Sequence, residues 1–428
     1  MDRFPIAVAA LVFCLFATLS VDADGPTPDP LTGHYYEWIT NFESWDEARV
    51  DARSRFFNGL PGHLATISDM RENRVVWQLA GGGINGWLGL TDSTDTSLLD
   101  GFDMSTLGTF EQGASGDLPL PADGVVPILG ERGYGFVWLD GTPMTFQKWS
   151  GNGPTAEPND GNGGNDGVTM TTSGGWNDDF AGVSLGQGVR DLRYTVEWDV
   201  VLSQQGFTVV ERRPAETFMG DGMVVNLEEA KALLALPSGD PDIDTELSAE
   251  AFVLSFHDPE LGGGLNLVTR SPFLSDTEAS DGNFAFGATG KVVIPTAGDW
   301  TFALTHGEDV EIVVGGNSFS STEGLLPTEL PRLVRSGEGD LVVTPGGGGD
   351  VFHFPSAGEY EISVTLLCST SFDFIQLFAI PGDVDTWDDT TFKLVGDILN
   401  GGLQVLEPSS LFTDGFESGD VTRWSGTN

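Results

Sequence analysis

The chain has 428 residues, and its 64 acidic and 19 basic residues give a formal net charge of −45. Such a surface repels nucleic acid and anionic membranes and attracts divalent cations, which excludes functions that need a basic face. An acidic, soluble surface suited to a salty environment explains the charge equally well. The length predicts two or three domains, and 58 glycines with 23 prolines are typical of β-rich folds with many turns.

The first 23 residues have the features of a secretory signal peptide. Arg3 supplies positive charge, residues 6–21 are mostly apolar, and residues 21–23 are small enough for cleavage. The apolar run is short for a membrane span and no second candidate follows, so we expect a secreted or cell-surface protein without membrane insertion. Because Cys14 lies in this segment, the mature chain would keep only Cys368, which we expect to be a buried, unreactive thiol.

Residues 24–33 are rich in Asp, Gly and Pro and are predicted to be a linker. A capping box at Ser44 predicts a helix to about Phe57, and Ser68 or Asp69 can cap a second helix that ends at Ala80. Further elements are expected as short strands at 64–67, 87–90, 136–138 and 146–149, with a loop at 93–132. Two helices, short strands and a long irregular loop predict a compact α+β unit over residues 34–200.

Residues 201–250 are predicted to be a connector with a helix at 227–236, in which 201–222 could also be an edge strand. Strands are then predicted at 252–256, 290–295, 300–305, 310–314, 360–367 and 372–380. In one of them Tyr360, Ile362, Val364 and Leu366 share a face. Many strands with Gly/Pro turns predict a mostly-β sandwich over 251–400, followed by an exposed tail at 401–428.

Nine short fragments between residues 34 and 198 stand out in chain order. They are Trp45 with Ala48, Gly62–Ile67, Glu72-Asn73, Trp87–Leu90, Trp138 with Asp140-Gly141, Trp149, Glu157-Pro158-Asn159, Trp176-Asn177-Asp178 and Tyr194–Glu197. In this order they resemble the C-type lectin-like family. Each fragment is weak alone, and their order carries the resemblance. The two family disulfides are missing, because the positions of their cysteines hold Ala52, Val196, Gly167 and Ala181. Residues 93–132 form either an extra loop near the sugar face or a solvated insertion.

The resemblance implies a calcium site. Its side-chain ligands would be Glu157, Asn159, Asn165, Asn177 and Asp178. Carboxylate and amide oxygens suit Ca²⁺ rather than zinc or a redox metal. The family usually has Glu where this chain has Asn165, so one negative charge is lost unless the neighbouring acid replaces it. A second calcium ion could use Asp92, Asp160 and Asp166.

The same residues imply carbohydrate binding. In the family, two adjacent ring hydroxyls occupy open positions on the ion and contact the equivalents of Glu157, Asn159, Asn165 and Asn177. The Glu-Pro-Asn order is the mannose/glucose/fucose type, whereas galactose binders typically carry Gln-Pro-Asp. We expect Trp176 to anchor the core rather than stack on sugar. Single lectin sites are weak, so multivalent glycan binding is expected.

Two other interpretations remain open. The chain could be a structural or protein-binding surface module in which calcium only stabilises the lectin-like loop. Catalysis is not expected, because the five histidines are scattered and none belongs to a recognisable Ser or Cys motif. Residues 290–380 resemble a protective-antigen-type β-sandwich, in which Glu308-Asp309 falls near a loop that binds calcium and sugar in some members.

Overall fold

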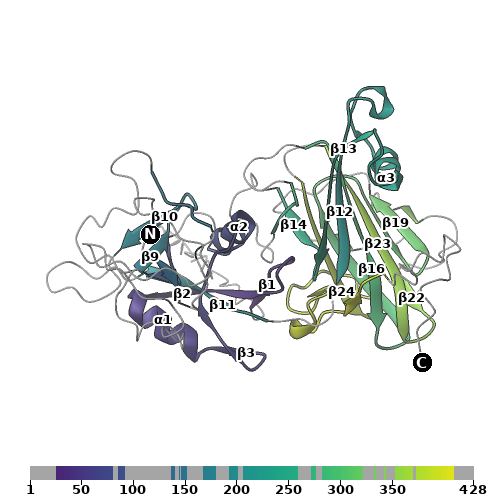
Figure 1. Cartoon of the computed structure of the whole chain (residues 1–428). Helices are drawn as coiled ribbons and strands as arrows, with labels where there is room; N and C mark the ends of the chain where they lie inside the picture. Colours follow the sequence, from purple (N-terminus) through teal and green to yellow (C-terminus); the bar gives the residue numbers. More distant parts are fainter. Residues whose placement is uncertain are drawn as a thin grey trace, which may run out of the picture.

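The computed structural model describes residues 26–80, 85–91, 136–139, 144, 146–151, 167–179, 192–200, 206–258, 271–275, 282–321, 332–333, 342–343, 352–369 and 373–408. These residues form a mostly β structure with few helices, in two parts that lie side by side (Figure 1). Among them, no helix is both long enough and apolar enough to cross a membrane.

The N-terminal part is built on one sheet in the strand order β1-β2-β11-β6-β9-β10, with β5 also paired to β11. Strand β11 runs antiparallel to β2 and parallel to β6, so the last strand of this part lies inside the sheet. The strands are β1 (Thr27–Pro28), β2 (Tyr35–Glu43), β5 (His63–Leu64), β6 (Gly86–Leu88), β9 (Gly167–Met170), β10 (Trp176–Asp179) and β11 (Leu192–Trp198). A separate pair consists of β7 (Leu90–Thr91) and β8 (Val137–Trp138).

The described residues of this part include the helices α1 (Trp45–Ser54) and α2 (Met70–Leu79), and both begin where the sequence predicts. The capping box is present, because Ser44 Oγ accepts a hydrogen bond from Glu47 N–H and the Glu47 carboxylate accepts one from Ser44 N–H. In α2, Asp69 Oδ1 accepts from the N–H of Glu72 at 2.8 Å. These bonds satisfy donors that the first turn of a helix leaves unpaired.

The prediction that the first helix reaches Phe57 is wrong, because a hairpin of β3 (Phe56–Phe57) and β4 (Leu60–Pro61) begins there. Asn58 and Gly59 at its turn have φ angles of 48° and 80°. A two-residue hairpin turn requires such left-handed values, and Asn-Gly is its strongest sequence signal. The strand predicted at 64–67 reaches only Leu64, and residues 146–149 contain a single bridge from Trp149 to Trp176 rather than a strand.

Close packing occupies one position where the family would have a disulfide. Ala52 and Val196 are both fully buried in the same apolar cluster. A Cβ atom on Gly62 would lie 2.6 Å from Val196 Cγ1 and 2.9 Å from the carbonyl oxygen of Ala52, so only glycine fits between them. At the second position Gly167 lies on β9, and Ala181 lies outside the described residues.

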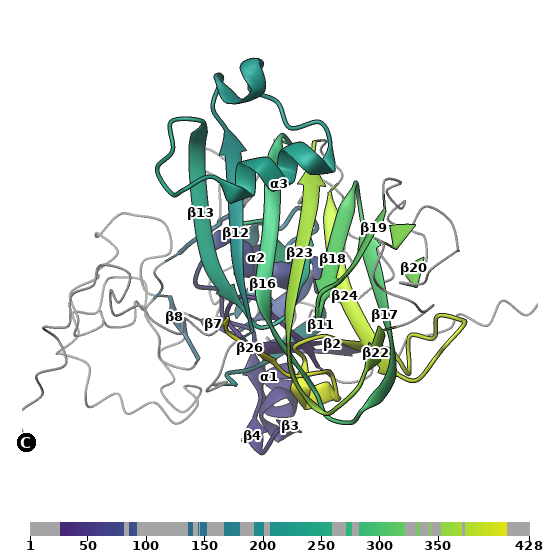
Figure 2. The same cartoon turned by 90° about the vertical axis from the view of Figure 1, so that its right-hand side faces the viewer.

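The C-terminal part consists of two sheets that share one apolar core (Figures 1 and 2). The first sheet has the order β13-β12-β16-β23-β18-β19-β21 with β26 on β16, and the second has the order β15-β14-β24-β17-β20 with β22 on β17 and β25 on β24. Phe286 and Ile362 of the first sheet and Phe302 and Leu377 of the second belong to one buried cluster. This arrangement fits the expected mostly-β sandwich, and its protective-antigen type stays a prediction.

The strands of the first sheet are β12 (Phe207–Pro214), β13 (Ile243–Ala251), β16 (Phe284–Ile294), β18 (Val310–Val314), β19 (Asn317–Ser321), β21 (Val342–Val343), β23 (Gly358–Cys368) and β26 (Val405–Leu406). Those of the second are β14 (Ser255–His257), β15 (Ser271–Pro272), β17 (Gly298–His306), β20 (Arg332–Leu333), β22 (Phe352–Phe354), β24 (Phe374–Pro381) and β25 (Lys393–Leu394). The alternation predicted for β23 is confirmed, because Ile362, Val364 and Leu366 are buried and Tyr360 packs against the same core. Cys368 is buried, as predicted.

Three segments predicted to lie outside the folded domains contribute to the sheets. Residues 201–250, expected as a connector, contain β12 and β13, and Glu211 and Arg212 of β12 are buried. Residues 24–33, expected as a linker, contain β1, and Leu31 packs against the core of the C-terminal part. The expected exposed tail begins with buried Leu403 and Val405, and its residues 409–428 lie outside the described residues.

Helix α3 (Leu227–Ala235) crosses the other face of the first sheet (Figure 2). Its first turn is capped, because Asn226 Oδ1 accepts a hydrogen bond from Glu229 N–H at 2.9 Å. At the other end, Arg212 donates from Nη1 to three carbonyl oxygens of the last turn, at 3.1, 2.8 and 2.6 Å. The arginine thereby satisfies acceptors that the end of the helix leaves unpaired.

Direct contacts join the two parts. The buried hydroxyl of Tyr35 donates to Asp397 Oδ1 at 2.8 Å. Leu31 packs against the core of the C-terminal part, and Leu399 packs against the apolar cluster of the N-terminal part. The segment before β2 and the segment after β25 therefore form an interface between the two parts.

Candidate functional site

Two of the predicted calcium ligands, Asn177 and Asp178, lie on β10. The other predicted site residues lie outside the described residues, namely Glu157, Asn159 and Asn165 of the first calcium site and Asp92, Asp160 and Asp166 of the second. The ligand sets therefore stay predictions, and the structure supplies the anchoring of β10.

Trp176 fixes the start of β10 and is fully buried, so its prediction as a core anchor is confirmed. Its indole N–H donates to Asn73 Oδ1 at 2.8 Å, and the Asn73 side-chain N–H donates to the carbonyl oxygen of Gly174 at 3.0 Å. Helix α2 and the turn before β10 are therefore tied together through one buried amide.

Three further aromatic rings surround Trp176. Trp138, Phe146 and Trp149 meet it edge-on, with ring centroids 5.7, 5.6 and 5.7 Å away. Such pairs contribute about 0.5–1.5 kcal/mol each beyond the area they bury. The backbone is fixed as well, because Trp176 N–H donates to the carbonyl oxygen of Lys148 at 2.7 Å.

Asn177 and Asp178 pair with Thr169 and Val168 of β9. Asp178 is only 4% exposed, whereas Asn177 is half-buried and its side-chain N–H donates to the carbonyl oxygen of Asp178 at 2.8 Å. Among the described residues, no hydrogen bond to Asn177 Oδ1 is found. One amide oxygen and one carboxylate on a rigid strand suit a hard cation such as Ca²⁺.

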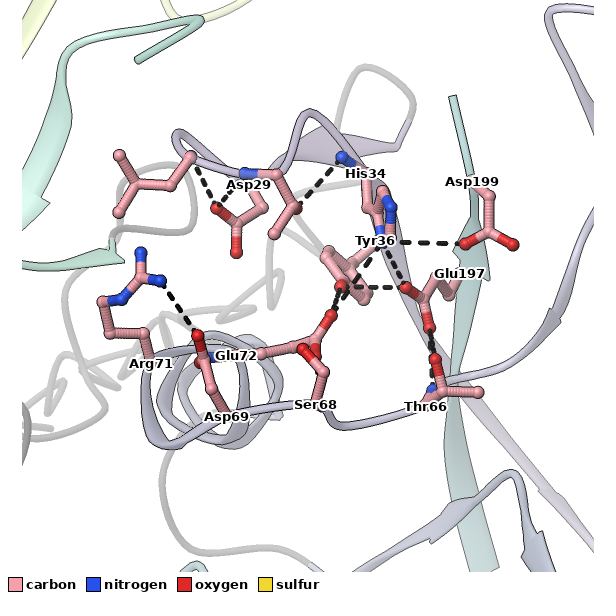
Figure 3. Close-up of polar contacts among 12 residues, drawn as sticks. Asp29, His34, Tyr36, Thr66, Ser68, Asp69, Arg71, Glu72, Glu197 and Asp199 are labelled. Carbon is pink, nitrogen blue, oxygen red and sulfur yellow. Dashed lines mark hydrogen bonds and ion pairs between the residues drawn. The ribbon is translucent and has the colours of Figure 1, made fainter. Parts of the chain in front are cut away.

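A second polar cluster, which sequence reasoning missed, lies on the same sheet (Figure 3). His34 Nδ1 is 2.7 Å from Glu197 Oε1 and 3.6 Å from Asp199 Oδ1, and His63 Nε2 is 3.1 Å from Asp199 Oδ2. Glu72 Oε1 is 3.9 Å from His34 Nδ1. The five histidines seemed scattered along the chain, but strand pairing brings two of them to the same carboxylates.

A tyrosine hydroxyl joins two carboxyl groups of this cluster. The Tyr36 oxygen lies 2.6 Å from Glu72 Oε1 and 3.0 Å from Glu197 Oε1, and its single hydrogen can serve only one of them. Burial and then the charge of Glu197 raise the pKa of Glu72 to about 7, so near neutral pH Glu72 can itself carry a proton.

Both histidines of the cluster favour the charged form. Burial opposes their protonation, but the hydrogen bond and charge of Glu197 raise the pKa of His34 to about 9. The hydrogen bond to Asp199 and the charges of both carboxylates likewise outweigh burial and raise the pKa of His63 to about 10. In His63 both ring nitrogens face acceptors, since Nδ1 lies 2.9 Å from the carbonyl oxygen of Leu64.

No family model matches the chain. Among curated proteins, halomucin of Haloquadratum walsbyi is 35% identical over 71 residues, which cover 15% of this chain and 1% of that protein. The chain therefore spans only about 1% of the length of this relative.

Solved structures similar to this chain include C-type lectin carbohydrate-recognition domains. The cow domain of CD23, determined in the presence of GlcNAc2Man3 oligosaccharide, has a TM-score of 0.24 and 21% identity, covering 40% of this chain and 90% of its own. The domain of the human scavenger receptor C-type lectin has a TM-score of 0.26 and 19% identity, with coverage of 41% and 98%. A PA14 sugar-binding domain from an RTX adhesin has a TM-score of 0.25 and 13% identity, with coverage of 45% and 99%. At these values the similarities identify no ligand of this chain.

Proposed function

We propose that this chain is a secreted, calcium-dependent carbohydrate-binding protein with mannose/glucose/fucose-type selectivity, and that it binds rather than catalyses. The observation that carries the proposal is the Trp176-Asn177-Asp178 strand. Its tryptophan is fully buried and hydrogen-bonded in the core, and it fixes the strand on which the amide of Asn177 and the carboxylate of Asp178 lie.

The rest of the donor set is proposed from the sequence. Glu157, Asn159 and Asn165 would add three side-chain oxygens to those of Asn177 and Asp178. Because Ca²⁺ takes roughly 6–8 oxygens, such a set leaves positions for two neighbouring hydroxyls of a sugar ring. Glu157 would accept hydrogen bonds from these hydroxyls, while the amide N–H groups of the asparagines would donate to them.

A glycan array tests the proposal when the full chain is applied first with CaCl2 and then with EGTA. We expect signals for mannose- and fucose-bearing glycans that disappear in EGTA. The variant Asp178→Asn should lose these signals. Asp388→Asn is the matched control, because it removes the same charge from an exposed turn of the C-terminal part.

Selectivity is tested by the double variant Glu157→Gln with Asn159→Asp, which should turn preference toward galactose. If it keeps mannose-type selectivity, the sugar site lies elsewhere. A blank array, with a melting temperature that CaCl2 still raises, would replace the lectin function with the alternative, a structural or protein-binding module stabilised by calcium.

A further inference from the structure

Strand register places five titratable side chains on one face of the N-terminal sheet. Tyr36 of β2 and His63 of β5 are both paired with Glu197, from opposite sides of β11. Since directly opposite residues of antiparallel strands share a face, all three side chains point the same way. His34 precedes β2 by one residue and Asp199 follows β11 by one, so they continue this face at the sheet edge.

We propose that His34, Glu197 and Asp199 form a binding site for a divalent transition-metal ion, and that Zn²⁺ is the ion that fits best. One ligand atom from each residue lies within 4.8 Å of the others. Ligand bonds of about 2.0–2.1 Å in a tetrahedron separate donor atoms by roughly 3.3 Å. The distances from His34 Nδ1 to the two carboxylates, 2.7 and 3.6 Å, bracket that separation.

The donor types distinguish this site from the proposed calcium site. An imidazole nitrogen with two carboxylates suits zinc and its neighbours, whereas Ca²⁺ prefers oxygen alone. The side chain of Asp199 is 50% exposed and that of His34 is 32% exposed, so a fourth position on the ion would open to solvent. Three protein ligands with an open position are typical of accessible zinc sites rather than closed structural ones.

Surrounding groups hold the proposed ligands in place. Glu197 is fully buried, and its Oε2 accepts hydrogen bonds from Thr66 N–H at 2.7 Å and from Thr66 Oγ1 at 3.0 Å. Its Oε1 lies within hydrogen-bond distance of the Tyr36 hydroxyl, and Asp199 is held by His63. Hydrogen-bond partners of this kind orient the metal ligands, and mutating one typically lowers metal affinity roughly 10–100-fold.

The charge of the cluster fits a divalent cation. Three carboxyl groups, those of Glu72, Glu197 and Asp199, converge on the two histidines. A divalent ion held by His34, Glu197 and Asp199 would place positive charge among these carboxyl groups.

Calorimetry on the full chain tests the site. Chelator-treated protein is titrated with ZnCl2 at about pH 7. We expect one strong site, with His34→Gln and Asp199→Asn each weakening zinc affinity by more than ~10-fold. Co²⁺ in place of Zn²⁺ should give visible absorption bands of a tetrahedral ion, and both variants should lose them.

His353→Gln is the matched control, because His353 Nδ1 lies 2.7 Å from Asp299 Oδ1 in an exposed pair. Among the described residues no third metal-binding group joins that pair, so this variant should bind Zn²⁺ unchanged. Binding should also persist in Asp178→Asn and in excess CaCl2, which separates this site from the sugar site. The proposal is overturned if the wild type shows no Zn²⁺ binding or if Asp199→Asn binds Zn²⁺ as tightly as wild type. It is also overturned if the control His353→Gln loses as much Zn²⁺ affinity as the ligand variants.

Discussion

Replacing Trp176 with phenylalanine should destabilise the strand that carries Asn177 and Asp178. The substitution removes the indole N–H, so the buried acceptor Asn73 Oδ1 loses its partner at 2.8 Å, which costs about 1–3 kcal/mol. It also removes three ring atoms from a fully buried position, and the resulting cavity costs roughly 2 kcal/mol more. We therefore expect a loss of about 4 kcal/mol in the unfolding free energy of the N-terminal part.

Urea unfolding of the full chain, followed by near-ultraviolet circular dichroism, measures this loss. The two parts could unfold in separate steps, so the midpoint of the N-terminal step is the quantity to compare. Trp387→Phe is the matched control, because Trp387 packs half-buried against Phe378 and Phe392 in the C-terminal part and should cost much less.

A double-mutant cycle isolates the hydrogen bond. Combining Trp176→Phe with Asn73→Ala should reveal a coupling energy of about 1 kcal/mol or more, because both variants break the same contact. The reasoning is refuted if Trp176→Phe costs no more than Trp387→Phe, or if the two substitutions at the contact are additive.

Three further predictions concern pH, the interface between the two parts, and the salt concentration. With chelator present, the stability of wild type relative to His63→Gln should fall by about 2 kcal/mol as pH rises from about 6.5 to about 10. Folding raises the pKa of His63, so the charged imidazole contributes its full stabilisation below the unfolded-state pKa and loses it above the folded-state pKa. Because its partner Asp199 is half-exposed, solvent screening makes this stabilisation smaller than the pKa shift alone implies. A constant difference in urea unfolding across that range would contradict this. Tyr35→Phe should cost about 2 kcal/mol and speed amide hydrogen exchange around Asp397, whose buried carboxylate loses a donor; unchanged exchange there would contradict it. Raising NaCl should raise the melting temperature, because salt screens a net charge of −45, and a flat response would show that this repulsion is unimportant.

Local features were predictable from the sequence. The helix starts at Ser44 and Asp69 depend on residues three positions apart, and the structure forms both caps. The hairpin turn at Asn58-Gly59 has an equally local signal, which the prediction of a longer helix overlooked. The burial of Trp176 agrees with the expectation that it anchors the core.

Features that depend on strand pairing were not predictable. His34 and Glu197 are separated by 163 residues and meet only because β11 inserts beside β2. The strands β1 and β26 have two residues each, too few to show an alternating pattern, so their segments resemble a linker and a tail in the sequence. For the calcium site, the sequence predicted the ligands and the structure supplies the rigid support of Asn177 and Asp178.

Calcium titration followed by sugar titration tests the central claim most directly. Chelator-treated full chain receives CaCl2 in a calorimeter, and a monovalent mannoside is then added to the calcium-loaded protein. We predict saturable heat in both steps, with both lost in Asp178→Asn and kept in Asp388→Asn. Mannoside heat that is the same in EGTA, or an Asp178→Asn variant that binds calcium and mannoside like wild type, would contradict the claim.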